Sequence, residues 1–401
     1  MASNDCQTKC LKDLKLGEEF DFEKVVLIRG QTPHDIKERC LQLCRDYLAH
    51  NWIQQTVDSI QVRRITGGLT NQLYYCGVNE PSLTSTAPQE VAIRLYGNKL
   101  YNNMTGDANE TLNDRSSERL SDVITSLILS ETQLGPKIYG LFEDGQILHY
   151  YQHRQFKLEE QKDPKLVEEL FRKIARVHAL DVPLPKRHWI FRRIDYNYEE
   201  AYRRHAINEM IEELNCETIK SHDLKAEVQW LKDMSVKIDS PLVFSHNDLF
   251  SPNVLVLDNK TASGDQLVIC DFEYSSYGFR GTDLGTIINE WGRLWNDTLT
   301  VHTFADDSAI KQLLQYYISE NEIIFGKSWS QNGMNSTEQL LKEVKLFALI
   351  WKMHLILLCL KMDEANDDFP MDKKLLVHLA EKEYENYWRI KSAFIQQNAF
   401  D

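Results

Sequence analysis

The chain has 401 residues, of which 42% are hydrophobic and 26% charged, as is typical of a folded globular protein with a sizeable core. Its formal net charge of −14 repels phosphate backbones and argues against nucleic acid as a partner. Eight scattered cysteines form no CxxC pair, which indicates reduced thiols. No basic region followed by an apolar run occurs at the N-terminus, and the most apolar run, Leu346 to Met362, contains Lys352 and His354. We expect a cytoplasmic protein without membrane insertion.

The first part of the chain predicts a β-rich region behind one early helix. Helical spacing covers Thr32–Asn51, and a second helix is predicted at Arg115–Glu131. Strand-like runs occupy Gln61–Thr66, Leu73–Val78, Glu90–Leu95, Ile138–Phe142 and Ile147–Tyr151. The Gly67-Gly68 pair between the first two strands predicts a hairpin with a glycine-rich loop.

The second part of the chain is dominated by helical periodicity. The predicted helices are Pro164–Ala179, Tyr198–Leu214, Leu224–Val236, Asp283–Trp295, Ser308–Phe325, Thr337–Met362 and Asp372–Phe394. Three short strands interrupt them, at Leu242–Phe244, Val254–Leu257 and Leu267–Cys270. The sequence therefore predicts an α+β chain of two lobes, with an N-terminal lobe at 1–152 and a C-terminal lobe at 153–401.

Two loops flanked by these short strands carry the residues best suited to phosphoryl transfer. Asp248 lies in the loop His246–Asn253, Asn253 follows five residues later, and Asp271 comes after the next strand. A carboxylate such as Asp248 can orient and accept the proton of an attacking hydroxyl, and the oxygens of Asn253 and Asp271 suit Mg²⁺. Asp and Asn also make turn hydrogen bonds. The order of the two loops nevertheless favours a catalytic and metal-binding pair.

These segments resemble the choline/ethanolamine kinase family. The likeness covers the His246-Asn247-Asp248 loop, the run Asp271–Tyr277, and a helix led by Asp283 that ends in Glu290-Trp291. The match is closer than to protein kinases, because Glu273 occupies the position of their DFG glycine. The resemblance implies a two-lobed protein-kinase-like fold in which the N-terminal lobe binds the nucleotide and the C-terminal lobe holds the catalytic and substrate-binding residues.

The glycine-rich loop fits a nucleotide site in the first lobe. The segment Ile65–Asn71 resembles the nucleotide loop of the family, and its small residues would let backbone amides approach phosphate oxygens. The predicted contacts to ATP from this loop are Gly67, Gly68, Thr70 and Asn71. A glycine pair is also common in plain hairpin turns.

Arg94 is predicted to contact the ATP phosphates, by resemblance to the strand lysine of kinases. Arginine suits bidentate phosphate binding, although a strand end can also simply expose a charge. Family register places its acidic helix partner at Asp122, and Glu118 one turn earlier is the alternative.

The residues predicted to form the substrate pocket follow Asp271 in the sequence. Glu273 lies two residues beyond Asp271, on the same face if this is a strand, and could assist the metal or the substrate. Glu290, Trp291 and Trp295 have helical spacing and are predicted to bind the amine; the resemblance places Glu290 beside the choline site and Trp295 in its aromatic cage. The tryptophans could equally be core residues.

Two departures from the family concern the amine pocket. Register places Leu355 and Leu358 where the family has two cage tryptophans, and a less aromatic wall stabilises trimethylammonium less. The segment His149–Arg154, which faces the adenine in the family, also differs.

The resemblance implies ATP-dependent phosphorylation of the hydroxyl of choline or ethanolamine, with Mg²⁺, as the first step of phospholipid head-group synthesis. Choline is favoured by motif, and the family is frequently homodimeric. The alternatives are an aminoglycoside-type phosphotransferase of the same fold and a catalytically silent binding protein. Asp283, at a predicted helix start, is expected to cap free amides and, as in kinase-like folds, to brace the catalytic loop.

Overall fold

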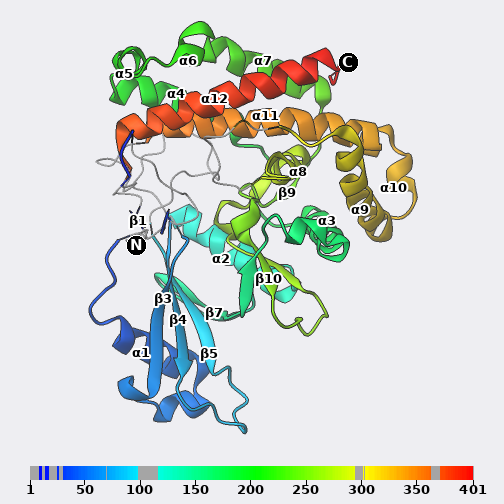
Figure 1. The fold of residues 1–401 in the computed structure, drawn as a ribbon. Helices are drawn as coiled ribbons and strands as arrows, with labels where there is room; N and C mark the ends of the chain where they lie inside the picture. Colours follow the sequence, from blue (N-terminus) through cyan, green and yellow to red (C-terminus); the bar gives the residue numbers. More distant parts are fainter. Residues whose placement is uncertain are drawn as a thin grey trace, which may run out of the picture.

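The computed structural model describes residues 9–10, 14–17, 25–26, 30–68, 70–97, 116–293, 301, 303–362 and 371–400. Within these ranges no helix is both long enough and apolar enough to cross a bilayer. Figure 1 shows a β-rich part and a helical part, which meet below a layer of long helices.

An antiparallel five-stranded sheet forms the β-rich part, in the order β3-β4-β5-β7-β6. Its strands are β3 (Ile60–Ile65), β4 (Gln72–Val78), β5 (Glu90–Leu95), β6 (Ile138–Phe142) and β7 (Gly145–His149). Helix α1 (Ile36–Leu48) covers one face, where Tyr74 and Cys76 of β4 are buried against Leu41. Because side chains alternate along a strand, the opposite face carries Tyr75, Ala92 and Arg94.

One helix is inserted between strands of this sheet, and one short strand after β7 leads to the helical part. Helix α2 (Ser116–Glu131) lies between β5 and β6, and the short strand β8 (His153–Gln155) pairs with β10 of the helical part. Strands β1 (Lys9–Cys10) and β2 (Val25–Val26) form a small parallel pair near the N-terminus. The predicted boundary between lobes at 152 and 153 therefore falls directly before the first strand that pairs with the second part.

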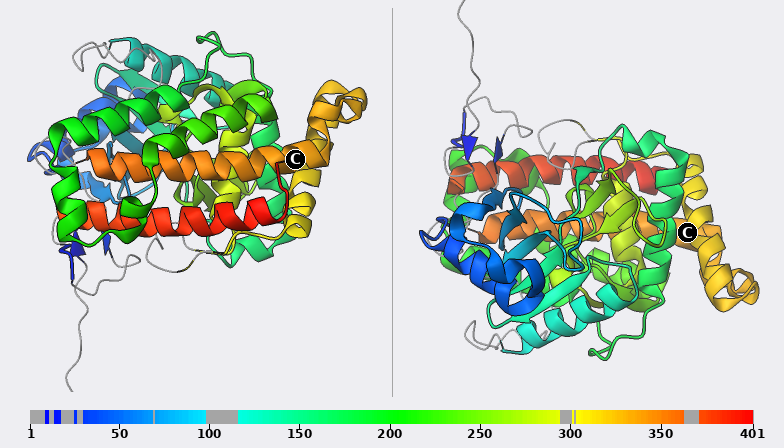
Figure 2. Two further views of the ribbon diagram at one scale, coloured as in Figure 1. Left: turned by 90° about the horizontal axis from the view of Figure 1, so that it is seen from above. Right: turned by 90° about the horizontal axis from the view of Figure 1, so that it is seen from below.

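The helical part is built around α11. Its helices are α3 (Pro164–His178), α4 (Ile190–Arg204), α5 (Ile207–Glu213), α6 (Glu217–Ser221), α7 (Leu224–Ile238), α8 (Arg280–Asn289), α9 (Asp307–Phe325), α10 (Ser328–Gln331), α11 (Thr337–Lys361) and α12 (Lys373–Gln396). Figure 2 shows α11 running between the green helices and α12, and it packs on α4, α7, α8 and α12. Side-chain caps start several of these helices, such as Ser336 accepting from Gln339 N at 3.2 Å.

The contact between α8 and α11 requires a glycine. A Cβ on Gly285 would lie 2.7 Å from the backbone nitrogen of Ala348 and 2.8 Å from the carbonyl carbon of Phe347. The helices approach this closely because no side chain separates their backbones. Helix α8, which follows the segment of Asp271 and Glu273 in sequence, is thereby fixed to α11, the longest helix of this part.

Four short strands lie between the helices and carry the site loops. They are β9 (Leu242–Ser245), β10 (Val254–Leu257), β11 (Leu267–Ile269) and β12 (Ser276–Phe279). Strand β12 pairs with β9, and the other two form the sheet β11-β10-β8. Short 3₁₀ turns complete the chain, at His50–Gln54, Val57–Ser59, Glu160–Lys162, Ser251–Asn253, Phe272–Tyr274 and Gly333–Asn335.

Most predicted elements are confirmed within a few residues, but three predictions are wrong. The single helix predicted at Tyr198–Leu214 is two helices, α4 and α5, that break at His205, whose ring contacts the Lys361 carbonyl at 2.8 Å. Helix α8 begins at Arg280, before the predicted start, because Arg280 is anchored to buried Glu343.

The same helix ends before its predicted limit, since Gly292 turns the chain with a φ of 81°. The third error concerns the residues after β11. Asp271 adopts a left-handed conformation with a φ of 63°, and a 3₁₀ turn follows, so Asp271 and Glu273 do not alternate along a strand.

Candidate active site

The loop between β9 and β10 places Asp248 beside Asn253. The amide Nδ2 of Asn253 donates to the backbone oxygen of Asp248 at 2.9 Å. This contact leaves the Oδ1 atom of Asn253 as the atom that can face a cation. Asn247, directly before Asp248, has a φ of 64°, a conformation that is uncommon outside glycine.

Asp283 holds the backbone of this loop. Its Oδ2 accepts from His246 N at 2.7 Å, and its Oδ1 accepts from Asn247 N at 2.8 Å. The predicted brace of the catalytic loop therefore has the expected partners. The predicted helix cap is wrong, because Asp283 lies inside α8 and its carboxylate points to the loop.

Arg94 of β5 reaches the loop after β11, which lies in the other lobe and carries Asp271 and Glu273. We call this segment the metal loop. The Arg94 guanidinium lies 2.7 Å from Asp271 Oδ1 and 3.3 Å from Glu273 Oε2. The structure thus brings three of the predicted site residues into one ion-paired group, although they are far apart in sequence.

The glycine-rich loop joins the same group through Asn71. Asn71 Nδ2 donates to Glu273 Oε2 at 3.0 Å, and Asn71 Oδ1 accepts from Gly97 N at 3.2 Å. Glu273 is buried, and its Oε2 contacts both Asn71 and Arg94, so it links the glycine-rich loop to β5.

The backbone of this loop needs its glycines. Gly67 has a φ of 116°, which a residue with a side chain rarely adopts, and a Cβ on Gly68 would lie 3.0 Å from the Asn71 oxygen. Thr70 of the same loop is buried.

Electrostatic interactions connect these groups. Burial raises the pKa of Asp248 well above its ordinary value, and the charges of Asp271 and Glu273 raise it further. Burial lowers the pKa of Arg94, but its acidic neighbours outweigh this effect and raise that pKa.

Asp122 of α2 contributes to this rise, after Asp271 and Glu273, and is itself buried. The side chain of Glu118, the alternative partner, lies outside the described part of the chain.

Glu290 lies at the end of α8, within electrostatic range of Asp248. Its Oε2 accepts from both the backbone nitrogen and the hydroxyl of Ser251, each at 3.0 Å. Burial raises the pKa of Glu290 to about 7, against the lowering effect of these hydrogen bonds and of the charge of Arg293. Ser251 was not singled out from the sequence, although it lies inside the catalytic loop.

The predicted aromatic residues are placed differently from one another. Trp291 packs against Phe156 and Phe171 with a hydrophobic cluster of the second part, whereas Trp295 lies outside the described residues. Leu358 belongs to an aliphatic cluster that includes fully buried Leu14 from the N-terminal segment.

The sheet face next to Arg94 carries an aromatic pair that the sequence reasoning missed. Tyr75 is paired with Ala92 across the strands and meets Tyr150 edge-on at 4.7 Å. Arg63 lies over the Tyr75 ring at 4.5 Å and donates to the Tyr150 hydroxyl at 2.6 Å. The period-2 pattern of β4 could have identified Tyr75 as facing Ala92.

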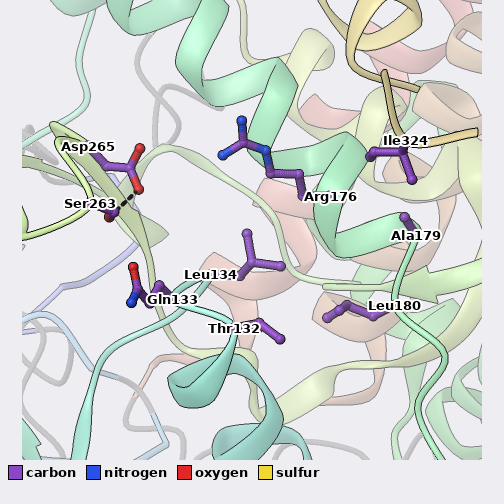
Figure 3. Close-up of a pocket in the computed structure, with 9 residues that line it drawn as sticks. All are labelled: Thr132, Gln133, Leu134, Arg176, Ala179, Leu180, Ser263, Asp265 and Ile324. Carbon is purple, nitrogen blue, oxygen red and sulfur yellow. Dashed lines mark hydrogen bonds between the residues drawn. The ribbon is translucent and has the colours of Figure 1, made fainter. Parts of the chain in front are cut away.

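A cavity of about 310 Å³ lies away from these residues, between the ends of α2 and α3 and the loop after β10. Figure 3 shows Arg176 and Asp265 on its walls. Arg176 is paired with Glu320 at 2.6 Å and Asp265 with Lys173 at 2.8 Å, so their charges are already compensated. The cavity contains none of the predicted site residues.

Comparison with solved structures agrees with a kinase-like architecture. A choline kinase from Cryptosporidium parvum superposes with a TM-score of 0.64 at 20% identity, covering 90% of this chain and 97% of that one. A Plasmodium vivax ethanolamine kinase gives a TM-score of 0.61 at 18% identity, with 90% and 91% covered. The fold is therefore the two-lobed protein-kinase-like fold.

Sequence comparison identifies the family. A model of the choline/ethanolamine kinase family matches residues 62–388, so the chain belongs to this family. The choline/ethanolamine kinase of Rattus norvegicus is 32% identical over 259 residues, and the match covers 64% of this chain and 61% of the rat protein. Mouse choline kinase alpha is 28% identical, with 78% and 72% covered. The chain thus spans less than two thirds of the length of the rat relative.

Proposed function

We propose that this protein transfers the γ-phosphoryl group of ATP to the hydroxyl of choline or ethanolamine. The observation that carries the proposal is the meeting of the two loops with Arg94. Asp248 and Asn253 come from one loop, Asp271 comes from the other, and Arg94 reaches the second loop from the opposite lobe. Family membership and the names of the relatives support the same reaction.

Asp248 is the group that we assign to the acceptor hydroxyl. Its carboxylate would orient the alcohol for in-line attack and accept its proton. Burial and the charges of Asp271 and Glu273 raise its pKa, so this carboxylate holds a proton more readily than an exposed aspartate does.

Asn253 and Asp271 would hold Mg²⁺. The donor set fits this ion, because it offers an amide oxygen and a carboxylate, both hard ligands. Burial is the main cause of the raised pKa of Asp248, and the carboxylates of Asp271 and Glu273 raise it further; a divalent cation would relieve this second effect. Held by these two residues, Mg²⁺ would supply positive charge to offset that of the ATP phosphates.

Arg94 and the glycine-rich loop would bind the ATP phosphates. Gly67 and Gly68 keep the loop backbone open to phosphate oxygens, and Thr70 and Asn71 follow them. Arg94 would exchange part of its contact with Asp271 for a phosphate, while Asp122 helps keep it charged.

We call Glu290 and Ser251 the amine end of the site, and the family register alone adds the positions of Leu355 and Leu358 on α11. Glu290 would face the ammonium group, because its carboxylate is buried and within electrostatic range of Asp248. The roles of Glu273 at the metal or substrate, and of Trp291 and Trp295 around the amine, remain predictions of the family resemblance.

The cellular setting follows from the same family. The proposed reaction supplies the phosphorylated head group for phosphatidylcholine or phosphatidylethanolamine synthesis. The thiols of the described part, including Cys216 and Cys270, are free, which fits the reducing cytoplasm. A homodimer remains a prediction of the resemblance.

An ADP-release assay tests the function. The purified chain is given ATP and Mg²⁺ with choline, ethanolamine, N-methylated ethanolamines or an aminoglycoside. We expect turnover of at least one amino alcohol, loss of it with a chelator, and no turnover by Asp248→Ala. Turnover of the aminoglycoside alone would disprove the assignment. The silent alternative would give a thermal shift with ADP and Mg²⁺ but no turnover with any acceptor.

A further inference from the structure

A buried histidine stands behind the brace of the catalytic loop. His178 is the last residue of α3, and both of its ring nitrogens are in contact with side chains of other helices. Nε2 lies 3.1 Å from Asp283 Oδ2 of α8, and Nδ1 lies 3.0 Å from the hydroxyl of Tyr317 on α9. All three side chains are buried.

The contacts assign the positions of the protons among Asp283, His178 and Tyr317. An ionised carboxylate has no proton to donate, so Nε2–H of His178 donates to Asp283. Nδ1 is then the acceptor of the neutral ring, and the Tyr317 hydroxyl donates to it. Burial raises the pKa of Tyr317, which keeps this hydroxyl protonated as this arrangement requires.

Asp283 depends on this donor because it is buried and charged. Burial alone would raise its pKa, but the hydrogen bond from His178 lowers it, together with the hydrogen bond from His246 N. A carboxylate held in the ionised form makes stronger hydrogen bonds to backbone amides than a protonated one.

The amides that Asp283 holds belong to a strained segment. Asn247 has a left-handed backbone, a conformation that persists only where the surroundings enforce it. Two sets of contacts enforce it: the Asp283 carboxylate binds Asn247 N, and Asn247 Nδ2 donates to the carbonyls of Tyr274 and Ser276 at 3.1 and 3.2 Å. Asp248 follows directly, so its direction depends on the Asn247 peptide.

We propose that His178 is a positioning residue, which acts through Asp283 to fix the Asn247 peptide and hence the carboxylate of Asp248. Its Nε2–H is the required group, and Tyr317 sets the tautomer that supplies it. The kinetic part of this inference rests on the proposed function, whereas the structural part does not.

Two substitutions of His178 distinguish the hydrogen bond to Asp283 from general packing, because each carries a side-chain amide but only one can reach Asp283. The terminal amide of His178→Gln can take the place of Nε2–H and donate to Asp283, whereas that of His178→Asn is too short to reach it. Asn is expected to reduce kcat about 30- to 100-fold, as a displaced reacting group does, with KM for ATP and the amino alcohol unchanged. Gln is expected to retain kcat within about threefold, on the same physical ground.

Tyr317→Phe is the milder third variant, because it removes one hydroxyl and keeps the ring. Its expected loss in kcat is about two- to tenfold, the size of one neutral hydrogen bond. Melting temperatures of all variants, measured with and without ADP and Mg²⁺, exclude unfolding as the cause.

Hydrogen exchange of the His246 and Asn247 amides supplies a readout that needs no turnover. Exchange should be faster in His178→Asn than in His178→Gln, since only Gln keeps the donor to Asp283. Equal exchange and equal kcat in the two variants would overturn the proposal, and so would a loss confined to KM. If the wild-type chain phosphorylates no amino alcohol, the proposed function fails, and the exchange comparison still decides whether His178 supports the loop.

Discussion

The catalytic loop and the amine end of the site are held in different ways. In the catalytic loop, one buried carboxylate, Asp283, binds the backbone amides of His246 and Asn247, and His178 contacts the same carboxylate. At the amine end, the Glu290 carboxylate accepts from Ser251 and lies within electrostatic range of Arg293 and of Lys352 on α11.

This difference separates reaction from recognition. The residues that we assign to phosphoryl transfer lie in segments that resemble the family motif, and hydrogen bonds from Asp283 hold the backbone before Asp248. At the amine end, the predicted family register places Glu290 at the glutamate and Leu355 and Leu358 at the two cage positions. We therefore expect substitutions in the first region to change the rate, and those in the second to change which amine is preferred.

The largest effect is expected for Asp248→Asn. Removing a general base reduces kcat about 10²- to 10⁴-fold. Stability should move the other way: the pKa of Asp248 is raised in the folded state, so its charged form costs stability at neutral pH, and the neutral amide relieves this cost. ADP release and the melting temperature test both parts. A fully active variant, or one that melts much earlier, would contradict the assignment.

Arg94→Lys should have the next largest effect. Lysine keeps the charge but not the forked donors, and a lost hydrogen bond to a charged group costs about 1.5–3 kcal/mol, or roughly 10- to 100-fold in kcat/KM for ATP. The acceptor KM should be unchanged. Steady-state kinetics with each substrate varied in turn checks this. A change in KM for the amine, without a change in kcat/KM for ATP, would place Arg94 at the amine end of the site.

Glu290→Gln should weaken binding of the amine and raise its KM about tenfold. This corresponds to the loss of one contact to a charged group, about 1.4 kcal/mol. Because the pKa of Glu290 is about 7, the wild-type carboxylate is protonated as pH falls through this value, and KM for the amine should rise. The variant has no such charge to lose, so its KM should be flat over this range. Parallel KM profiles of the two proteins would show that Glu290 does not face the amine.

Leu355→Trp has the smallest expected effect, and it tests whether the amine end of the site sets the preferred amine. Leu355 is half-buried, and a tryptophan face near a quaternary ammonium contributes about 0.5–1 kcal/mol, or roughly two- to fivefold in KM for choline over ethanolamine. Leu355→Met is the control, because it changes shape without adding a ring. A preference that does not differ between the two variants would place the amine elsewhere.

The sequence predicted most of the elements because their patterns are local. Strand β5 at Glu90–Leu95 and strand β6 at Ile138–Phe142 appear with the predicted bounds, since alternation and turn residues surround them. The break at His205 was missed because it depends on a contact with the end of α11, far away in sequence. The conformation of Asp271 was missed for a similar reason, as propensity gives no indication of a left-handed aspartate.

The candidate site divides along the same line. Asp248, Asn253 and Asp271 were predicted from their types and spacing, because phosphoryl transfer needs a carboxylate and oxygen ligands and kinase motifs carry them in this order. His178 could not, since a histidine at the end of a helix has no motif around it and gains its role from two other helices.

By itself the sequence determined the strands, most of the helices and the residue types that the reaction needs, because these follow from local patterns and from the chemistry of the side chains. The tertiary structure alone decided that Arg94 meets Asp271 and Glu273, that Asn71 joins them, and that a leucine from the N-terminal segment packs beside Leu358. Such contacts are formed only when distant segments are packed together, and no local pattern encodes which segments will meet.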